Sequence, residues 1–222
     1  FRRAADSGSY SAYIDGNEVK LELELTPTQP LLLQGDSGFS RKGSEAVEAS
    51  HYYSQPQLAV RGHVGLEGGR AQVRGRAWLD HEWSTTVLDA QAAGWDWIGI
   101  NLDDGGALMA FRIRAREGGT TRWAAARLRQ SDGRIRDYAS GEVRFETLAT
   151  WRSPRTGTLY PVRSRVVLGR GTELLGQPQV GPLATSFLAY SILRKSVTIT
   201  RRARNSRAAK ARLPTRSAEI FG

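Results

Sequence analysis

The sequence predicts an all-β protein made of short antiparallel strands, and two observations lead to this fold class. About nine β-rich segments follow one another at intervals of roughly 8–15 residues, with turn sequences between them, a spacing typical of sandwiches and barrels. No segment before Ala189 repeats apolar residues with the 3.6-residue period of a helix. A chain of 222 residues is long enough for one large or two small domains with a hydrophobic core.

The first predicted strands lie between residues 19 and 79. Val19–Leu25 carries apolar side chains at odd positions and charged side chains at even positions, which indicates a strand with one buried face. Gln57–Val64 and Ala71–Leu79 are the next two strands, and Glu67–Gly69 between them suits a hairpin turn.

The remaining predicted strands are joined by turns that contain glycine. Asp103–Gly106 and Ser131–Gly133 are such turns, since glycine reaches backbone conformations that tight turns require. These strands are predicted at residues 95–102, 107–114, 123–129, 135–138, 142–148 and 161–168.

The formal net charge of +10 is concentrated in the last 32 residues. Residues 191–222 hold nine basic side chains and one acidic side chain, whereas residues 1–190 have a net charge of only +2. Basic segments bind phosphate groups, but Phe221 is the only aromatic residue of this tail and bases have little to stack on. We therefore expect no nucleic-acid partner, and a tail that is disordered or forms a basic helix over residues 203–212.

The composition argues against several other classes. The chain has no Cys, which excludes a disulfide scaffold, a thiolate metal site and a cysteine nucleophile. No run approaches the ~20 apolar residues of a membrane-spanning helix. The first residues, Phe1–Ala5, show no signal peptide.

The densest functional chemistry lies in two blocks that hold four of the six Trp residues. Trp78–Trp83 reads Trp-Leu-Asp-His-Glu-Trp, and Gly94–Trp97 reads Gly-Trp-Asp-Trp. Aromatic walls exclude water and raise the pKa of a carboxyl group, which makes it a general acid. Asp80 is the candidate acid, and His81 or Glu82 could assist it by shuttling protons or orienting it. The candidate ligand-binding residues are Trp78, Trp83, Trp95, Asp96, Trp97, Tyr52 and Tyr53.

The same residues also fit a structural role, because Trp and His at strand ends often belong to a core or its rim. His51, His63 and His81 could meet at a metal ion, but their spacing matches no His-x-His or His-Glu-x-x-His motif. We therefore expect neither a metal nor another cofactor.

Side-chain alternation complicates the role of Asp80. In a regular strand the odd-numbered residues from Val73 to Trp83, which look like a barrel interior, would face away from the even-numbered residues from Gln72 to Glu82. Asp80 would then reach an apolar pocket only through a β-bulge, or from a pocket that lies between two barrels. The sequence leaves both arrangements open.

A Gly- and Ser-rich stretch, Gln34–Gly43, precedes the aromatic cluster at residues 51–54. It could cradle a phosphate, but it fits neither the Walker spacing nor a Rossmann glycine motif after a strand. We interpret it as a plain loop.

Several blocks together resemble the AttH-like and carotenoid 1,2-hydratase family. They are, in order, Leu33–Gly43, Tyr52–Ser54, Trp78–Trp83, Gly94–Trp97 and Leu108–Met109. The resemblance covers about residues 15–165, and residues 151–161 are similar to the second domain of the family.

The resemblance implies two packed lipocalin-like β-barrels, the first at residues 1–90 and the second at residues 91–190, followed by the basic tail at residues 191–222. Family members begin with a Glu-Trp-Trp-Tyr-type strand and end with a block similar to Tyr-Trp-Glu-Gly. Neither motif is found here, so we expect two incomplete barrels and an aberrant C-terminus.

The resemblance also implies a function and a location. The family includes exported bacterial proteins described as secreted hydrolases, some linked to ABC-transport components, and carotenoid hydratases. In the hydratases an Asp that matches Asp80 is thought to protonate a double bond, with nearby Trp rings, here Trp83, stabilising the cation. We expect an exported, lipocalin-like protein that binds an apolar or lipid-like molecule, with ABC-transporter components as candidate partners. The alternative is a hydratase or hydrolase that uses Asp80 as general acid on a hydrophobic substrate.

Overall fold

The computed structural model describes residues 1–17, 19–66, 69–85, 90–169, 172–178 and 195–201. These residues form antiparallel strands and one short 3₁₀ turn, Ser140–Glu142, with no α-helix among them. The predicted all-β fold class is therefore confirmed, and the sheets do not close into complete barrels. The contacts divide the chain into two compact units, residues 1–141 (unit 1) and 142–222 (unit 2).

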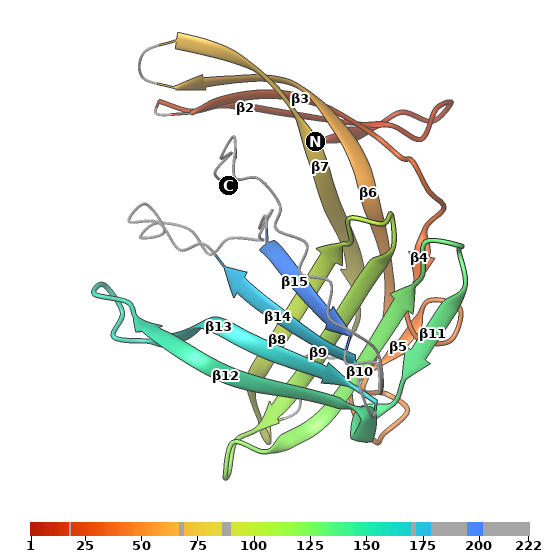
Figure 1. Ribbon diagram of the computed structural model, residues 1–222, viewed down its shortest axis with the longest axis vertical. Coiled ribbons are helices and arrows are strands. Elements are labelled where there is room, and N and C mark those ends of the chain that lie inside the picture. Colours follow the sequence, from red (N-terminus) through yellow and green to blue (C-terminus); the bar gives the residue numbers. More distant parts are fainter. Residues whose placement is uncertain (18, 67–68, 86–89, 170–171, 179–194, 202–222) are drawn as a thin grey trace. The chain divides into compact units, whose positions relative to one another are not determined.

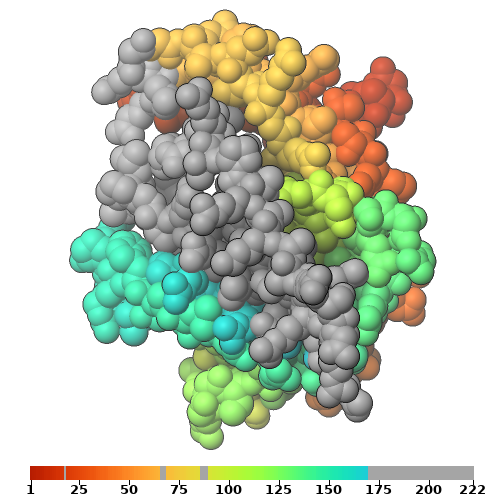
Figure 2. Space-filling view, in the orientation of Figure 1, coloured from red at the N-terminus to blue at the C-terminus, as the bar shows by residue number. Residues whose placement is uncertain are grey.

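The first sheet of unit 1 is built around two long, curved strands, β6 (Ala49–Leu66) and β7 (Gly69–Trp83) (Figure 1). Along the edge opposite β7, β6 pairs with β3 over one half of its length and with β4 and β5 over the other half. Figure 2 shows the red to orange surface of the N-terminal strands beside the yellow surface of this hairpin. The other five strands are β1 (Arg2–Arg3), β2 (Tyr10–Asp15), β3 (Lys20–Thr26), β4 (Leu32–Leu33) and β5 (Phe39–Arg41).

β3 shows the alternation that its sequence predicts. Leu25 is buried and the other two leucines are half-buried, whereas the charged residues between them are exposed. Glu24 pairs with Arg61 of β6 at 2.8 Å across the exposed face. Such exposed pairs contribute little to stability, so burial of the leucine face holds this strand in its register.

The second sheet of unit 1 has four antiparallel strands in the order β11-β10-β9-β8. The predicted Asp103–Gly106 turn connects β8 to β9, with Gly105 at a φ of 89°. The predicted barrel boundary at residue 90 falls just before this sheet, but the chain divides only after Gly141. The reason is that one hydrophobic cluster contains side chains of both sheets. The strands are β8 (Ala92–Asn101), β9 (Ala107–Ala115), β10 (Thr121–Arg129) and β11 (Ile135–Tyr138).

Unit 2 contains a four-stranded antiparallel sheet in chain order. Its first two strands extend the predicted ones, and a turn closed by the bond from Ser153 N to Thr158 O (2.9 Å) joins them. Of the tail predicted to be disordered, only Lys195–Arg201 is described, and it forms a strand that pairs with β14. Val197 and Ile199 give this segment β-branched residues at alternate positions, which favours a strand. The predicted helix at residues 203–212 lies outside the described residues. The strands are β12 (Val143–Arg152), β13 (Leu159–Leu168), β14 (Thr172–Pro178) and β15 (Lys195–Arg201).

In the part of the chain that the structure describes, no helix is both long and apolar enough to cross a membrane.

A β-bulge in β6 connects the two sheets of unit 1. The pairing with β7 is interrupted between Gln55 and Leu58, and Gln57 has a left-handed backbone with a φ of 54°. The Gln57 side chain is 3% exposed. Its amide nitrogen donates to the carbonyl oxygens of Leu102 (2.9 Å) and Gly106 (2.7 Å) in the β8–β9 turn. One side chain therefore fixes the bulge and attaches it to the neighbouring sheet.

We predict that Gln57→Gly lowers the free energy of unfolding by about 1–3 kcal/mol, because two buried carbonyl groups lose a hydrogen-bond donor. Glycine tolerates the left-handed backbone, so the substitution adds no backbone strain and the loss comes from removal of the buried side chain. The measurement is urea denaturation followed by Trp fluorescence.

Ser37→Gly is the matched control, because Ser37 has a similar φ of 51° but an exposed side chain. It should leave the stability unchanged or raise it slightly. Equal effects of the two substitutions would show that Gln57 does not hold the sheets together.

Candidate functional site

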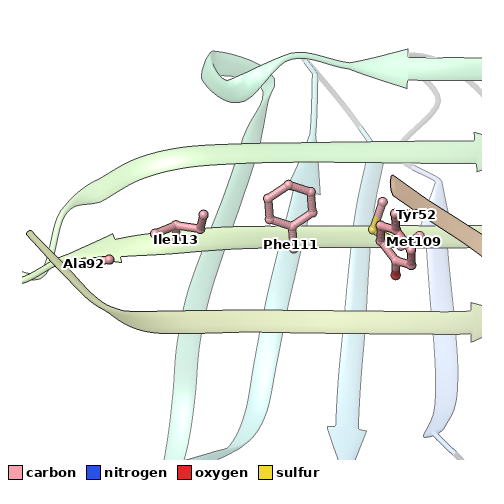
Figure 3. Packing of buried hydrophobic residues seen from close by; sticks show 5 residues of the cluster. All are labelled: Tyr52, Ala92, Met109, Phe111 and Ile113. Atoms are coloured by element: carbon pink, nitrogen blue, oxygen red, sulfur yellow. The ribbon is translucent and has the colours of Figure 1, made fainter. Parts of the chain in front are cut away.

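An aromatic and aliphatic cluster joins the two sheets of unit 1. Met109, Phe111 and Ile113 alternate along β9 and therefore share one face, and Figure 3 shows them in a row with Tyr52 of β6 close by. Trp78, Trp97 and Trp123 are half-buried and pack against this cluster. The two Trp blocks of the sequence thus meet in space, because β7 supplies one and β8 supplies the other.

Gly99 of β8 makes room for two of these rings. A Cβ atom at this position would lie 2.5 Å from the Trp97 ring and 2.8 Å from the Trp78 ring. The two indoles approach each other edge to face, with ring centroids 6.4 Å apart, a favourable arrangement for aromatic pairs. The absence of a side chain at Gly99 therefore permits the packing of Trp78 on Trp97.

A pocket of about 240 Å³ opens at the end of this cluster. Its walls are mainly apolar and aromatic, and they include four of the predicted ligand-binding residues together with the predicted catalytic residue Glu82. Polar groups enter the walls at two ion pairs, Lys42 with Glu82 (2.7 Å) and Arg122 with Glu48 (3.2 Å). The main lining residues are Tyr52, Trp83, Trp95, Trp97, Phe111 and Ile113.

Asp80 lies beside the pocket and is not one of its lining residues. Its Oδ1 atom accepts hydrogen bonds from Ser54 Oγ (2.5 Å) and from Trp78 Nε1 (2.9 Å). Burial raises the pKa of the Asp80 carboxyl, although the hydrogen bonds from Ser54 and Trp78 oppose this effect. The carboxyl group therefore keeps a proton to higher pH than an ordinary aspartate does.

Tyr52 stands between Asp80 and the pocket. The residue is 2% exposed, and its hydroxyl accepts a hydrogen bond from Trp97 Nε1 at 2.9 Å. Burial strongly raises the pKa of the Tyr52 hydroxyl, and the negative charge of an ionised Asp80 adds to this shift of the pKa. The hydroxyl therefore stays neutral and can act as a hydrogen-bond donor. Tyr52 is thus a wall residue of the pocket whose hydroxyl is sensitive to the charge of Asp80.

The strand register determines which face of β7 meets the cluster. Ser54 is paired with Asp80 and Tyr52 with Glu82, without interruption up to His51 and Trp83. The even-numbered residues of β7 therefore face the apolar cluster, and Asp80 reaches it without a bulge in its own strand. The odd-numbered Ala77 belongs to a second cluster on the opposite face.

Three predicted site residues lie away from the pocket. His81 and Tyr53 are on the opposite face of the β6–β7 pair from Asp80, where His81 Nδ1 lies 2.9 Å from the Tyr53 hydroxyl. Asp96 points away from its neighbours Trp95 and Trp97 and pairs with Arg112 at 2.6 Å. Neighbouring residues of a strand face opposite directions. This alternation separates His81 from Asp80, and Asp96 from Trp95 and Trp97.

Several pocket residues were not among the predicted site residues. Phe111 and Ile113 could have been found from the alternation of β9, which places them beside Met109 on one face. Lys42 lies in the stretch interpreted as a plain loop, and Glu48 and Arg122 belong to no recognised motif. Among the described residues, no group of three or more His, Asp or Glu side chains could hold a metal ion.

Comparisons with known proteins agree on one family. The model of the AttH-like family matches residues 1–182. A crystal structure of a Nitrosomonas europaea protein assigned as AttH is 43% identical with a TM-score of 0.78, over 90% of this chain and 62% of that one. Kievitone hydratase from Nectria haematococca is 14% identical with a TM-score of 0.61, over 81% of this chain and 59% of that one.

The second likeness concerns the fold alone, and this chain spans about three-fifths of the length of each structure. No curated protein matches the sequence. The family match extends over most of the sequence, including both sheets of unit 1 and the first strands of unit 2. The chain therefore belongs to the AttH-like family.

Proposed function

We propose that the pocket of unit 1 binds an apolar small molecule. Small-molecule sites are concave and mostly apolar, with a few polar groups that orient the ligand. The pocket has this composition, since aromatic and aliphatic walls surround two ion pairs. Its volume of about 240 Å³ suits a small molecule with up to about three rings.

The exposure of the Trp95 ring at the pocket supports this proposal most directly. Trp95 is 63% exposed, although it lines the pocket. Exposure of a large apolar side chain to water is unfavourable. A bound apolar molecule would cover that surface and gain about 25 cal/mol per Å² of apolar area buried. An exposed apolar patch at a concavity is typical of a binding site.

We predict that Trp95→Ala weakens the binding of N-phenylnaphthylamine roughly tenfold, because the variant loses apolar contact area worth about 1–2 kcal/mol. The measurement is a fluorescence titration, since this neutral probe brightens in apolar surroundings. Trp95 is mostly exposed, so its removal leaves the fold intact.

Tyr13→Ala is the control, because Tyr13 is an aromatic residue of unit 1 that is 69% exposed and does not line the pocket. It should not change the affinity. Failure of the unsubstituted chain to bind the probe, or equal losses in the two variants, would contradict the proposed function.

Hydration of a carbon–carbon double bond is a second candidate function, favoured by the raised pKa of Asp80. The carboxyl proton would add to one alkene carbon and leave a cation on the other. Water would then bond to the cation and return a proton to the carboxylate. Aromatic faces stabilise such a cation, and Trp78 and Trp97 lie on the side of β7 that Asp80 faces.

We predict that Asp80→Asn abolishes hydration of methylheptenone, a small alkene, while N-phenylnaphthylamine still binds. Hydration is measured as formation of the tertiary alcohol product by gas chromatography with mass spectrometry. In the unsubstituted chain the rate should fall as the pH rises through the raised pKa of Asp80, because the reaction uses the protonated acid.

Asp103→Asn, in an exposed turn, is the control and should keep the rate. No turnover by the unsubstituted chain, or equal turnover by Asp80→Asn, would leave ligand binding as the function. Export and association with ABC-transporter components stay predictions that rest on the family resemblance.

A further inference from the structure

Lys42 places an ammonium group in the wall of the aromatic pocket. The residue follows β5 directly, and its backbone amide donates to the Glu48 carbonyl at 2.6 Å, which closes the intervening loop. Its side chain is only 18% exposed. The Nζ atom lies 4.2 Å from the centroid of the Phe111 ring and 4.8 Å from that of Tyr52.

The surroundings of Lys42 act on its charge in two opposite directions. Nζ pairs with Glu82 Oε1 at 2.7 Å and donates to Ser40 Oγ at 3.1 Å. Two aromatic faces add cation–π attraction. Burial lowers the pKa of the Lys42 ammonium, and the ion pair with Glu82 opposes that shift.

One hydrogen of the ammonium group is available to a ligand. An ammonium group has three N–H donors, and Glu82 and Ser40 accept two of them. No further acceptor is bonded to Nζ among the residues that the structure describes. Because Lys42 lines the pocket, an acceptor atom on a bound molecule can take the third donor.

The charges of the pocket walls do not favour an anion. Lys42 and Arg122 are each paired with a carboxylate that also lines the pocket, Glu82 and Glu48 respectively. The four charges cancel. A carboxylate ligand would lose its hydration and gain no net attraction from these four charges, whereas an uncharged acceptor would bond to Lys42 without that desolvation cost.

We propose that Lys42 is the polar anchor of the pocket and selects apolar molecules that carry one uncharged acceptor, such as a ketone or ester carbonyl. The proposal rests on the proposed binding function and narrows it to this ligand class. A pure hydrocarbon would cover the ammonium group and leave its third donor without a partner, which binding sites penalise.

Three compounds of the same diphenyl framework test this proposal with the full chain. Benzophenone has a carbonyl group, diphenylmethane has a methylene group in its place, and diphenylacetate has a carboxylate. Displacement of N-phenylnaphthylamine, followed by the loss of its fluorescence, gives the three affinities. Benzophenone should bind at least about tenfold more tightly than either of the others, as expected for a hydrogen bond from a charged donor.

Lys42→Met keeps the length of the side chain and removes the donor. It should abolish the preference for benzophenone over diphenylmethane, because benzophenone loses its hydrogen-bond donor while diphenylmethane no longer covers an unsatisfied one. Lys20→Met is the control, because Lys20 forms an exposed ion pair with Asp15 outside the pocket. Infrared spectroscopy of bound benzophenone adds a measurement on the unsubstituted chain, since a hydrogen bond from the ammonium group lowers the carbonyl stretching frequency.

Each failure has a distinct meaning. Equal binding of benzophenone and diphenylmethane, with no shift of the carbonyl band, would overturn the role of Lys42 and leave the proposed function standing. Tighter binding of diphenylacetate would overturn the preference for an uncharged acceptor. Equal losses for both neutral compounds in Lys42→Met would show that Lys42 supports only the fold, and no binding of any compound would contradict the proposed function itself.

Discussion

The register of β6 against β7 determines which side chains of this protein reach the aromatic cluster. A side-chain period of two means that a shift of one residue would exchange the two faces of either strand. The register is fixed at the bulge, where Gln57 takes a left-handed backbone and bonds to the β8–β9 turn. Beyond the bulge, Ser54 lies opposite Asp80 and Tyr52 opposite Glu82. The site therefore depends on a backbone irregularity outside the Trp blocks.

The two faces of the β6–β7 pair carry different chemistry as a result. One face presents Asp80 and Tyr52 to the apolar cluster, where burial raises the pKa of both groups. The other face presents a stacked group of exposed rings, with His51 and Trp83 at 5.3 Å and His81 and Trp83 at 5.0 Å between centroids. Residues that are adjacent in the Trp78–Trp83 block are thus divided between an enclosed environment and a solvated one.

Local sequence patterns predicted most of the fold. The alternation of Val19–Leu25 and the glycine turns depend only on neighbouring residues, and the strands are found where those patterns lie. The extension of β6 back to Ala49 was not predicted, because the pairing with β7 stabilises residues 49–56 from outside their own sequence.

The site was predictable only where local composition reveals it. The Trp blocks and Asp80 stand out by composition, and Trp97 and Tyr52 do lie at the pocket. Lys42 was missed because nothing in a Gly- and Ser-rich loop shows that β5 will carry it between Tyr52 and Phe111. The sequence also did not decide whether the Asp80 side chain faces the apolar cluster. That orientation depends on the register of β7 against β6, and the bulge that sets this register lies in β6.

The most direct test of the account is to locate a bound apolar molecule. Trifluoromethyl phenyl diazirine is small, uncharged and photoreactive, and mass spectrometry can map its adducts after irradiation of the full chain. We expect labels on pocket residues such as Trp97, Phe111 and Ile113, reduced by an excess of competing diphenylmethane, which is not photoreactive. Labels confined to the exposed rings around His51 and His81, or spread over unit 2, would contradict it.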